Sequence, residues 1–483
     1  MMNCLKSSLT LYETLKNSAN KYSKKVAIYF DNSSITYKEL VSKVDEISKI
    51  LVTNNVKPNS VVTIVSHNNI ETIAMFYAIN KIGAVANILH YGVSVNEIVS
   101  SLELTNSRFL YTDRIELKEE INVKKNLNLF IFPNLILEKI QNRKIEPLCK
   151  DCSVILYTSG STSTPKGIMF QNHQFNAFFE QSKDFYPDIT SNDTVLVTLP
   201  LFHGFGLATG IHNNLALGAS IIILSREDKK HIDNIFELRK PSFIIGVPSF
   251  FELLIQNDKI VNKSLTYVKK ILIGGAPTYN GYERDISAFF EKHNSNPDIQ
   301  VGYGLTEALS GVTLNKPQKF KGVGIPFKNN QIKIINKKGY IGEICVKGPT
   351  LMIGYLNAKS TIDNEGWLHT GDLGYLKDDN LFIIGRSSRT VSVSGYSVSL
   401  DNIEEKLSKN KLIQKTAVIS VPDKIRGNIV IAFIITKLSE IDVIKYCKSV
   451  LPIFAIPEIR IVNSIPLTST GKINYQKLKG LVL

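Results

Sequence analysis

Short apolar runs alternate with amphipathic stretches through the first part of the chain. The run Val26–Phe30 predicts a buried strand, and the stretch after it places Tyr37, Leu40 and Val44 on one face of a helix. The run Val61–Val65 predicts the next strand, and helical patterns continue to alternate with apolar runs beyond it. Because strands and helices alternate along the chain, we expect largely parallel sheets covered by helices.

The same alternation continues in the middle of the chain. Strands are predicted over 194–199, 243–248 and 268–273, and a helix over 232–239. The first strand leads into Phe-His-Gly-Phe-Gly at 202–206, the second ends at a proline, and the third leads into Gly-Gly-Ala-Pro. Ligands of open α/β sheets bind beyond the carboxyl ends of strands, so these segments are candidates for lining a site.

A hydroxyl-rich loop occupies residues 157–167, Tyr-Thr-Ser-Gly-Ser-Thr-Ser-Thr-Pro-Lys-Gly, directly after the apolar run 154–156. Glycines let backbone N–H groups approach an anion, the hydroxyls can donate to phosphate oxygens, and Lys166 adds a positive charge. A flexible surface linker has a similar composition, so the loop alone leaves both readings open. Its spacing excludes the Gly-x4-Gly-Lys-Ser/Thr loop of the common nucleotide hydrolases.

A second cluster, Gly302-Tyr303-Gly304-Leu305-Thr306-Glu307, follows an apolar run. An aromatic ring between glycines can stack on a base, while Thr306 and Glu307 offer a hydroxyl and a hard carboxylate to a phosphate and Mg²⁺. Taken alone, the pattern also fits a strand-turn-helix junction with Thr306 as the N-cap. Its combination with the hydroxyl-rich loop favours a nucleotide site.

Two further polar residues stand out. Asp372 lies between Gly371 and Gly374, where its carboxylate can accept hydrogen bonds from both hydroxyls of a ribose. His203 stands among aromatic residues, where a histidine more often packs in a core than acts on a substrate. No acidic residue lies beside His203 in the sequence, so an ammonium group bound there would be buried without a counter-charge.

Composition limits the partners. The 483 residues favour a large domain plus a smaller one, and 43% hydrophobic with 21% charged residues is ordinary for a globular protein. The formal net charge of +14 favours anionic partners such as ATP, coenzyme A or an acidic carrier protein, although a lysine-rich composition is the better explanation of the charge. No basic run is long enough to indicate nucleic-acid binding.

The five cysteines and the length of the apolar runs indicate in which compartment of the cell the protein is expected. An odd number of cysteines in a long chain argues against a disulfide framework and for a reducing compartment. Nowhere do 18 apolar residues follow one another, so no integral membrane segment is expected. The sequence therefore predicts a cytoplasmic protein.

Taken in order, these motifs closely resemble those of the adenylate-forming superfamily, which comprises acyl-CoA synthetases, stand-alone and modular adenylation domains, and luciferases. The resemblance covers essentially the whole chain. It implies an α/β fold in which a large N-terminal domain of mixed and parallel sheets, helices and a distorted β-barrel precedes a small mobile α+β lid. We expect the domains to span 1–384 and 385–483, with the hinge near 385–388.

The resemblance also implies roles for single residues. Lys472, in Thr-Ser-Thr-Gly-Lys, matches the family's catalytic lysine, and Arg386 matches the arginine that reaches the ribose. The residues implied for the chemistry are Lys472, Thr306, Glu307 (also the metal ligand) and His203. Those implied for nucleotide binding are Thr158, Ser159, Gly160, Ser161, Thr162, Lys166, Gly275, Ala276, Pro277, Gly302, Tyr303, Gly304, Asp372 and Arg386. Those implied for the substrate pocket are His203, Phe205, Gly206, Val247 and Pro248.

The expected reaction is ATP-dependent activation of a carboxylic acid as an acyl adenylate, with pyrophosphate release, followed by transfer to a thiol. ATP, Mg²⁺ and coenzyme A are the expected cofactors, and a fatty or aryl acid the expected substrate. One alternative acceptor is the phosphopantetheine thiol of an acyl or peptidyl carrier protein.

A third possibility is a degenerate member that binds nucleotide without turnover. Ser163, Ser388 and Ser392 depart from the family pattern, which motivates this possibility and predicts slow or selective adenylation.

Overall fold

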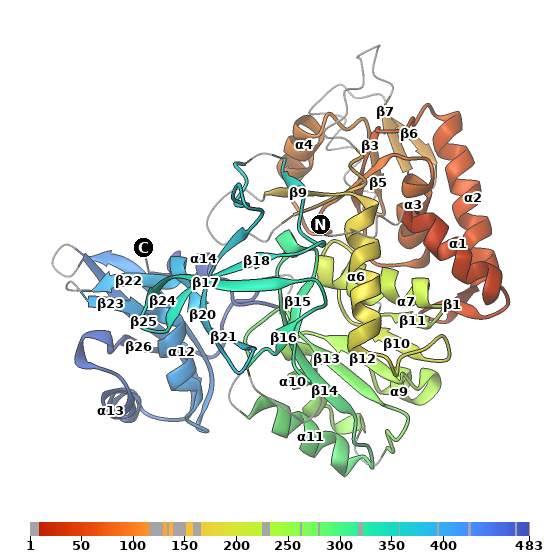
Figure 1. Cartoon of the computed structure of the whole chain (residues 1–483). Helices are drawn as coiled ribbons and strands as arrows, with labels where there is room; N and C mark the ends of the chain where they lie inside the picture. The colour runs from red at the N-terminus through yellow and green to blue at the C-terminus, as the bar shows by residue number, and fades with distance from the viewer. Residues whose placement is uncertain are drawn as a thin grey trace.

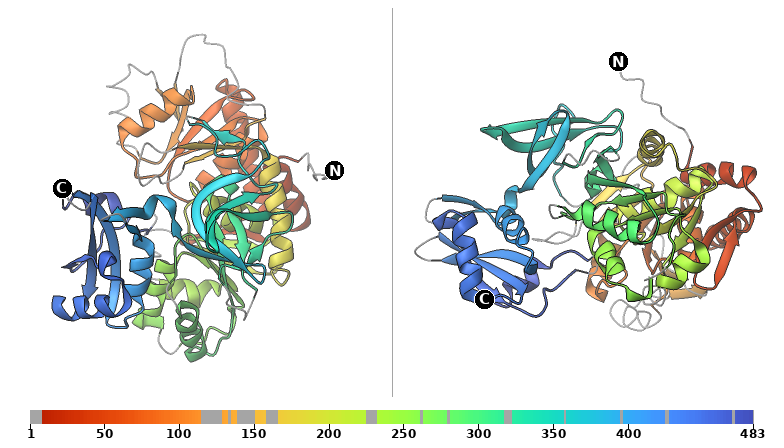
Figure 2. Two further views of the ribbon diagram at one scale, coloured as in Figure 1. Left: turned by 60° about the vertical axis from the view of Figure 1, so that its left-hand side comes forward. Right: turned by 90° about the horizontal axis from the view of Figure 1, so that it is seen from below.

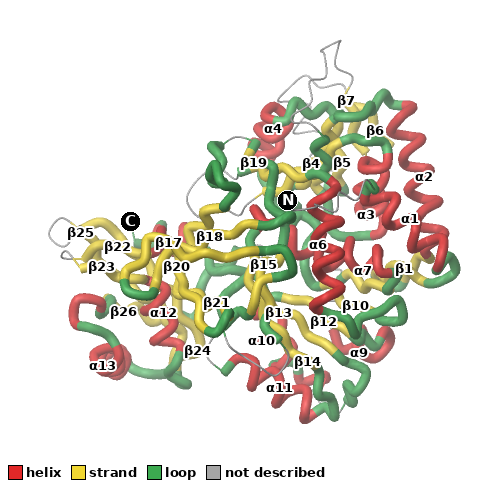
Figure 3. Tube along the Cα trace, in the orientation of Figure 1, coloured by secondary structure: helices red, strands yellow, loops and turns green. Residues whose placement is uncertain are grey.

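A computed structural model of the chain describes most of its residues. The described ranges are 9–114, 129–132, 135–138, 151–157, 166–224, 232–260, 263–278, 281–316, 322–356, 358–393, 396–423, 427–468 and 471–482. Within these ranges no helix combines the length and the apolar character that crossing a bilayer requires. Strands occupy the middle of the molecule, with α1, α2 and α11 at its periphery (Figure 3).

The first sheet has nine strands in the described part of the chain, in the order β16-β15-β14-β13-β12-β10-β11-β1-β2. Its six central strands pair in parallel, and β2, β15 and β16 add antiparallel edges. The bounds are β1 (Val26–Phe30), β2 (Ser33–Thr36), β10 (Thr194–Val197), β11 (Ser220–Ile223), β12 (Phe243–Gly246), β13 (Lys270–Ile273), β14 (Asp298–Gly304), β15 (Gly311–Leu314) and β16 (Ile325–Pro326).

The second sheet has the order β19-β9-β8-β4-β3-β5-β7-β6 among the described residues. Four of its strands, β8, β4, β3 and β5, run parallel, as the alternation of strands and helices predicted. The bounds are β3 (Val61–Val65), β4 (Val85–Ile88), β5 (Phe109–Thr112), β6 (Leu129–Phe132), β7 (Leu135–Glu138), β8 (Val154–Tyr157), β9 (Gly167–Phe170) and β19 (Gly354–Tyr355).

Helices cover these sheets (Figure 1). Their bounds are α1 (Leu11–Lys21), α2 (Tyr37–Thr53), α3 (Ile70–Lys81), α4 (Val95–Leu104), α6 (Asn172–Phe185), α7 (Asn213–Leu217), α9 (Ile232–Arg239), α10 (Pro248–Ile255) and α11 (Tyr282–Lys292). The predicted stripe on α2 is buried, because Tyr37, Leu40 and Val44 have no exposed surface. Thr36 and Glu39 form a capping box that fixes where α2 begins.

A π-helix, η1 (Phe205–His212), follows β10 and was not predicted. Gly206 is required at its start, because a Cβ there would lie 2.1 Å from the Pro200 carbonyl oxygen. The Asn214 amide donates to the carbonyls of Thr209 (2.9 Å) and Gly210 (2.7 Å), so a side chain helps satisfy this wider turn. π-Turns are rare and are often found at functional sites.

A separate four-stranded antiparallel sheet has the order β17-β18-β20-β21. It lies apart from the helix-covered sheets, next to the C-terminal part of the chain (Figure 2). This is the strand-rich stretch in which the family resemblance implied a distorted barrel. The bounds are β17 (Gln331–Lys338), β18 (Ile341–Lys347), β20 (Leu368–Lys377) and β21 (Asn380–Arg386).

The C-terminal part is a small α+β unit, coloured blue in Figure 1. Two apolar clusters, one around Leu407 and Val443 and one around Ile431 and Leu478, give it its own core. The predicted boundary after residue 384 falls inside β21 and, like the mobility of this unit, stays a prediction. The elements are β22 (Thr390–Val393), β23 (Tyr396–Ser399), α12 (Leu400–Ser408), β24 (Ile413–Asp423), β25 (Gly427–Thr436), α13 (Glu440–Val450), β26 (Glu458–Ile461) and α14 (Tyr475–Lys479).

Candidate active site

The predicted site segments meet at one edge of the nine-stranded sheet. Neighbouring parallel strands β10, β12, β13 and β14 all end there, and each leads directly into a predicted segment. This is the edge at which open α/β sheets bind ligands. In strand order the segments carry His203, Val247 with Pro248, Gly275 with Ala276 and Pro277, and Thr306 with Glu307.

An apolar wall joins the predicted substrate pocket to the predicted nucleotide-binding residues that follow β13. A Cβ on Gly274 would lie 3.2 Å from the Phe205 ring, and one on Gly275 would lie 3.4 Å from Val247 Cγ1. Gly275 has φ +81°, which a residue with a side chain rarely adopts. The glycines therefore let Phe205 and Val247 approach the backbone after β13, as a wall for a flat or aliphatic group requires.

His203 is held against the turn that carries Thr306 and Glu307. A Cβ on the next residue, Gly204, would lie 1.7 Å from the Leu309 carbonyl oxygen, so only glycine permits this approach. The His203 Nδ1 atom is buried and has no hydrogen-bond partner among the described residues. Burial, and secondarily the Lys472 charge, lower the pKa of His203 to about 4, so the ring is neutral at pH 7.

Asp372 is the centre of a buried hydrogen-bond cluster. Its Oδ2 accepts from the Tyr303 hydroxyl at 2.6 Å, and its Oδ1 accepts from Arg386 Nε at 2.8 Å. Asp372 follows an irregular position in β20. Gly371 has φ +71° there, and the register of β20 against β18 shifts. The structure thus brings together three residues predicted from separate motifs, and the Tyr303–Asp372 bond was not foreseen.

Glu307 lies in the turn that follows β14. It belongs to the short helix η3 (Thr306–Ala308), and its Oε1 accepts from the Tyr355 hydroxyl at 2.9 Å. The Lys166 ammonium lies 5.0 Å from the centre of the Tyr355 ring. Burial, and then the Glu307 charge, raise the pKa of Tyr355 to about 12. Tyr355 was not predicted as a site residue, and its contacts add it to the site.

The predicted phosphate-binding residues Thr158, Ser159, Gly160, Ser161 and Thr162 lie outside the described residues, as does Ser163. Of the predicted nucleotide-binding residues in that loop, Lys166 is the one that the structure describes. The first residue of the loop, Tyr157, ends strand β8, and its last residue, Gly167, begins β9.

Lys472 reaches the site from the C-terminal unit. Its loop closes on itself, since the Thr468 N–H donates to the Lys472 carbonyl at 2.6 Å and the Lys472 N–H to Thr468 Oγ1 at 3.1 Å. A Cβ on Gly471 would lie 2.8 Å from Ser249 Oγ, so the loop rests on the start of α10. Burial, and then the Arg386 charge, lower the pKa of Lys472, while Asp372 opposes them.

A network that was not predicted surrounds Arg389, directly after the predicted hinge at 385–388. Arg389 donates to Asp401 and, at 2.7 Å, to Glu404, and its guanidinium lies 3.9 Å from the centre of the Tyr475 ring. The Arg386 backbone N–H donates to Asp401 at 2.8 Å. Burial raises the pKa of Glu404 to about 7. Acidic residues fifteen positions from an arginine give no local signal, so only the fold reveals the pairing.

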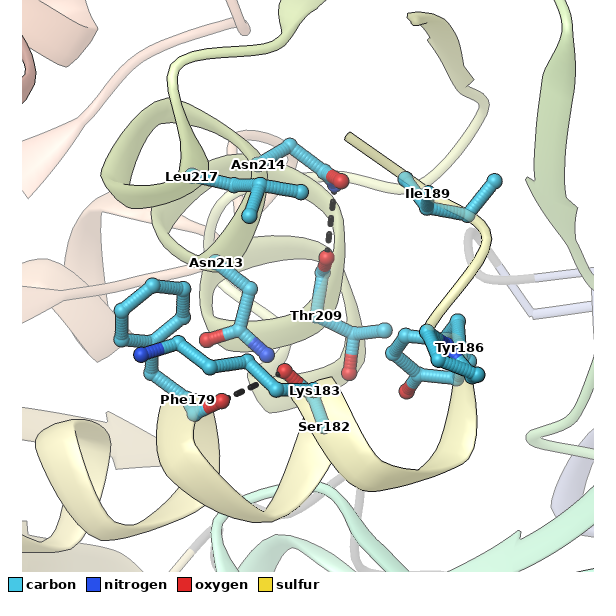
Figure 4. A pocket seen from close by; sticks show the side chains of 10 residues that line it. Phe179, Ser182, Lys183, Tyr186, Ile189, Thr209, Asn213, Asn214 and Leu217 are labelled. Carbon is cyan, nitrogen blue, oxygen red and sulfur yellow. Dashed lines mark hydrogen bonds between the residues drawn. The ribbon is translucent and has the colours of Figure 1, made fainter. Parts of the chain in front are cut away.

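A cavity of about 150 Å³ lies between α6, α7 and the π-helix (Figure 4). Its lining includes Ser182, Tyr186, Thr209 and Asn213. No predicted site residue lines it, so it is separate from the site assembled at the strand ends.

Comparison with protein families decides the classification. The model of the AMP-binding enzymes matches residues 15–356, and that of the AMP-binding enzyme C-terminal domain matches residues 402–472. The chain belongs to the AMP-binding enzymes. These form the adenylate-forming superfamily that the motifs indicated, and the expected class of adenylate-forming acid–thiol ligases is confirmed.

Curated AMP-binding enzymes from several organisms are similar along most of the chain. 4-Coumarate–CoA ligase-like 6 of Arabidopsis thaliana is 28% identical over 88% of this chain and 82% of its own. A long-chain-fatty-acid–CoA ligase of Bacillus subtilis is 25% identical over 97% and 94% of the two chains. A luciferin 4-monooxygenase of Luciola mingrelica is 28% identical over 75% and 69%.

Solved structures of AMP-binding enzymes share the whole fold. ATP-bound MatB from Rhodopseudomonas palustris matches with a TM-score of 0.85 at 22% identity, covering 98% of both chains. The o-succinylbenzoate CoA synthetase of Bacillus subtilis in complex with ATP and a magnesium ion matches with 0.80 at 24%, covering 96% and 99%. The predicted α/β architecture, with a large N-terminal and a small C-terminal domain, is therefore confirmed.

Proposed function

We propose that the protein activates a carboxylic acid with ATP as an acyl adenylate and transfers the acyl group to the thiol of coenzyme A. The observation that carries the proposal is the position of Lys472. Its charge lowers the pKa of His203 in the predicted acyl pocket, and its own pKa responds to Arg386 and Asp372 in the predicted ribose cluster. Lys472 thus acts electrostatically on both the predicted acyl pocket, where the carboxylate would bind, and the predicted ribose cluster, where the nucleotide would bind.

In the first step a carboxylate oxygen attacks the α-phosphorus of ATP, and pyrophosphate leaves. Both reactants are anions, so the chain's main tasks are to hold them together and to neutralise charge. Lys472 bridges the carboxylate and the α-phosphate, while Thr306 contacts that phosphate. Asp372 retains free lone pairs beside its two bonds, with which it accepts from the ribose hydroxyls.

Glu307 suits a magnesium ion. Mg²⁺ prefers hard oxygen ligands and is usually held by one or two carboxylates together with substrate phosphates. The Tyr355 hydroxyl occupies one oxygen of Glu307 and orients it, which leaves the other available. A bound ion would supply charge neutralisation at the phosphates. Lys166 and the hydroxyl-rich loop then hold the outer phosphates.

The pocket favours a fatty or aryl acid. Its wall, Phe205 and Val247, is apolar, and the charge that acts on His203 is the positive one of Lys472. An α-ammonium would therefore meet a like charge, and no acid among the described residues contributes to the pKa of His203. The similar 4-coumarate–CoA ligase-like protein and long-chain-fatty-acid–CoA ligase carry an aryl and a fatty acid in their names, which agrees with this substrate class.

For the second step, we infer from the family that the C-terminal unit turns, withdraws Lys472 and admits the thiol. Residues near 385–388 serve as the hinge. The alternative acceptor is the phosphopantetheine thiol of a carrier protein, which would need a docking surface on this unit. A chain that binds nucleotide without turnover is the other alternative.

One experiment separates the three. The protein is incubated with ATP, Mg²⁺ and panels of fatty and aryl acids, first alone, then with free coenzyme A, then with a phosphopantetheinylated carrier protein, and products are identified by mass spectrometry. Acyl-CoA formation supports the proposal. Acyl adenylate with transfer to the carrier alone supports the second function, and nucleotide binding without adenylate for any acid supports the third.

A further inference from the structure

Three potential metal ligands share one face of the four-stranded sheet. Glu343 and Cys345 are two residues apart on β18, so their side chains project from the same face. His369 on β20 is the direct cross-strand partner of Cys345. The cluster lies outside the residues assigned to adenylation, and none of its members was predicted as a site residue.

The ligand atoms are spaced as a tetrahedral ion requires. Cys345 Sγ lies 3.8 Å from His369 Nδ1, and that nitrogen lies 3.5 Å from Glu343 Oε2. All three ligand atoms lie within 4.8 Å of one another. Zinc binds sulfur at about 2.3 Å and nitrogen or oxygen at about 2.0 Å, so tetrahedral ligands are about 3.3–3.6 Å apart. A small contraction would complete the geometry.

A second layer of hydrogen bonds orients the three side chains. His369 Nε2 lies 3.3 Å from Asp363 Oδ2, so a proton on Nε2 leaves the Nδ1 lone pair facing Cys345 and Glu343. Asp363 is itself fixed by the backbone N–H groups of Trp367 (2.9 Å) and Glu365 (3.0 Å). This carboxylate–histidine arrangement is the usual support of a zinc-bound histidine.

Glu343 has similar support. Its Oε1 accepts from the Gly371 N–H at 3.1 Å, which leaves Oε2 for the cluster. Lys333 lies 4.0 Å from Asp363 and 3.6 Å from Glu365, so its positive charge offsets part of the negative charge around the cluster. The two carboxylates and a thiolate left beside it favour a divalent cation.

We propose that Glu343, Cys345 and His369 bind a zinc ion, with water as the fourth ligand. The set of one sulfur, one nitrogen and one oxygen suits a borderline-soft divalent cation and does not suit Mg²⁺. Coordination displaces the thiol proton to solvent. The site is distinct from the magnesium position at Glu307.

The zinc ion has a structural consequence for the ribose cluster. His369 and Asp372 lie three residues apart on β20, on either side of Gly371, whose N–H contacts Glu343. Linking β20 to β18 at Cys345 therefore fixes the irregular stretch that displays Asp372. We assign the metal a positioning role and no part in the chemical steps.

Titration of the metal-stripped protein with Co²⁺ tests the site, because a thiolate ligand gives Co²⁺ a near-ultraviolet charge-transfer band. We expect one equivalent to bind with this band, and Zn²⁺ to displace it. Cys345→Ser should abolish the band and weaken binding at least a hundredfold. Asp363→Asn, which removes the carboxylate behind His369 and keeps an oxygen for the Trp367 and Glu365 N–H groups, should weaken it about 10- to 100-fold.

Cys447→Ser is the matched control, since Cys447 is likewise a buried free cysteine but lies in the core of the C-terminal unit. It should bind Co²⁺ as the unaltered protein does. Alkylation of the unaltered protein, with peptide mapping, provides a test that needs no variant: Zn²⁺ should protect Cys345 selectively. Binding without a thiolate band, undiminished binding by Cys345→Ser, or equal alkylation with and without Zn²⁺ would each overturn the proposal.

Discussion

The two ends of the candidate site differ in how completely their polar atoms are paired. At the ribose end, both oxygens of Asp372 accept hydrogen bonds, one from Tyr303 and one from Arg386. At the pocket end, His203 Nδ1 is buried with no partner among the described residues, and burial lowers the pKa of Lys472. The ribose end is a finished network, whereas the pocket end holds a buried ring nitrogen without a described partner and a lysine that is partly removed from solvent.

The difference indicates where substrate binding energy acts. A finished network positions the nucleotide at little reorganisation cost. Unpaired buried groups are costly, and a substrate that pairs them recovers that cost. The carboxylate and the α-phosphate are anions, so their arrival beside Lys472 should raise its pKa again. The polar groups at the pocket end are therefore expected to gain their partners when the reactants bind. Substitutions there should lower the rate of adenylation most.

Lys472→Ala should have the largest effect. We expect adenylate formation to fall about a thousandfold, because the charge that bridges the two anions is lost. Thioester formation from supplied acyl adenylate should stay near that of the unaltered protein. The two half-reactions are measured separately by pyrophosphate exchange and by acyl-CoA production. Equal loss in both would mean that Lys472 acts elsewhere.

Glu307→Gln should come next. We expect kcat for adenylation to fall about a hundredfold, and the Mg²⁺ concentration for half-maximal rate to rise, because a neutral amide holds the ion poorly. The matched variant Tyr355→Phe keeps the carboxylate and removes only its hydroxyl donor. For Tyr355→Phe, kcat for adenylation should fall about tenfold or less. A larger loss in Tyr355→Phe than in Glu307→Gln would contradict the metal assignment.

Asp372→Asn should affect binding more than the rate. We expect the KM for ATP to rise about tenfold, the equivalent of about 1.4 kcal/mol, with kcat changed little. The free energy of unfolding should fall by about 2 kcal/mol, since hydrogen bonds to a buried charge are lost. Steady-state kinetics and urea unfolding measure the two effects. A fall in kcat with an unchanged KM would show that the ribose end is not merely a binding network.

The pH dependence of stability should give the smallest effect. Burial lowers the pKa of His212 to about 3, and that of His203 is lowered to about 4, so both remain neutral in the fold at pH 5. The unfolded chain takes up protons below pH 6.5, so stability is retained above that pH and is lost as the pH falls. For His212 the loss at pH 5 is about 2 kcal/mol.

His212→Gln checks this prediction, because it should flatten the decline in urea midpoint between pH 7 and pH 5. His212 accepts from or donates to Tyr77 at 3.1 Å in the core, away from the pocket, so the change should leave the pH profile of adenylation alone. An undiminished decline would assign the acid sensitivity to other groups.

Much of the architecture could be predicted from the sequence. The continuous apolar runs marked β1 (Val26–Phe30) and β3 (Val61–Val65), and β3 is buried at every position. The helical pattern marked α9 (Ile232–Arg239), because burial of one helix face imposes a period of 3.6 on the side chains. The π-helix after β10 could not be predicted. It depends on the contacts of Gly206 with Pro200 and of Gly210 with Val197, which a linear pattern does not contain.

The site residues could be named from motifs, but their pairing could not. The bond between Tyr303 and Asp372 joins residues 69 positions apart, and that between Tyr355 and Glu307 joins residues 48 apart. Arg389 was not predicted to pair with any residue, and it is paired with Asp401 and Glu404 inside the C-terminal unit. Such contacts depend on how separate strands are brought together, and one sequence carries no record of them.

The most direct test of the account is acid-dependent ATP–pyrophosphate exchange by the unaltered protein, measured across panels of fatty, aryl and α-amino acids with Mg²⁺. The account predicts exchange with one or more fatty or aryl acids and none with α-amino acids, because the pocket end offers Lys472 and no acidic partner for an ammonium. Exchange driven best by an α-amino acid, or none with any acid by a protein that binds ATP, would contradict it.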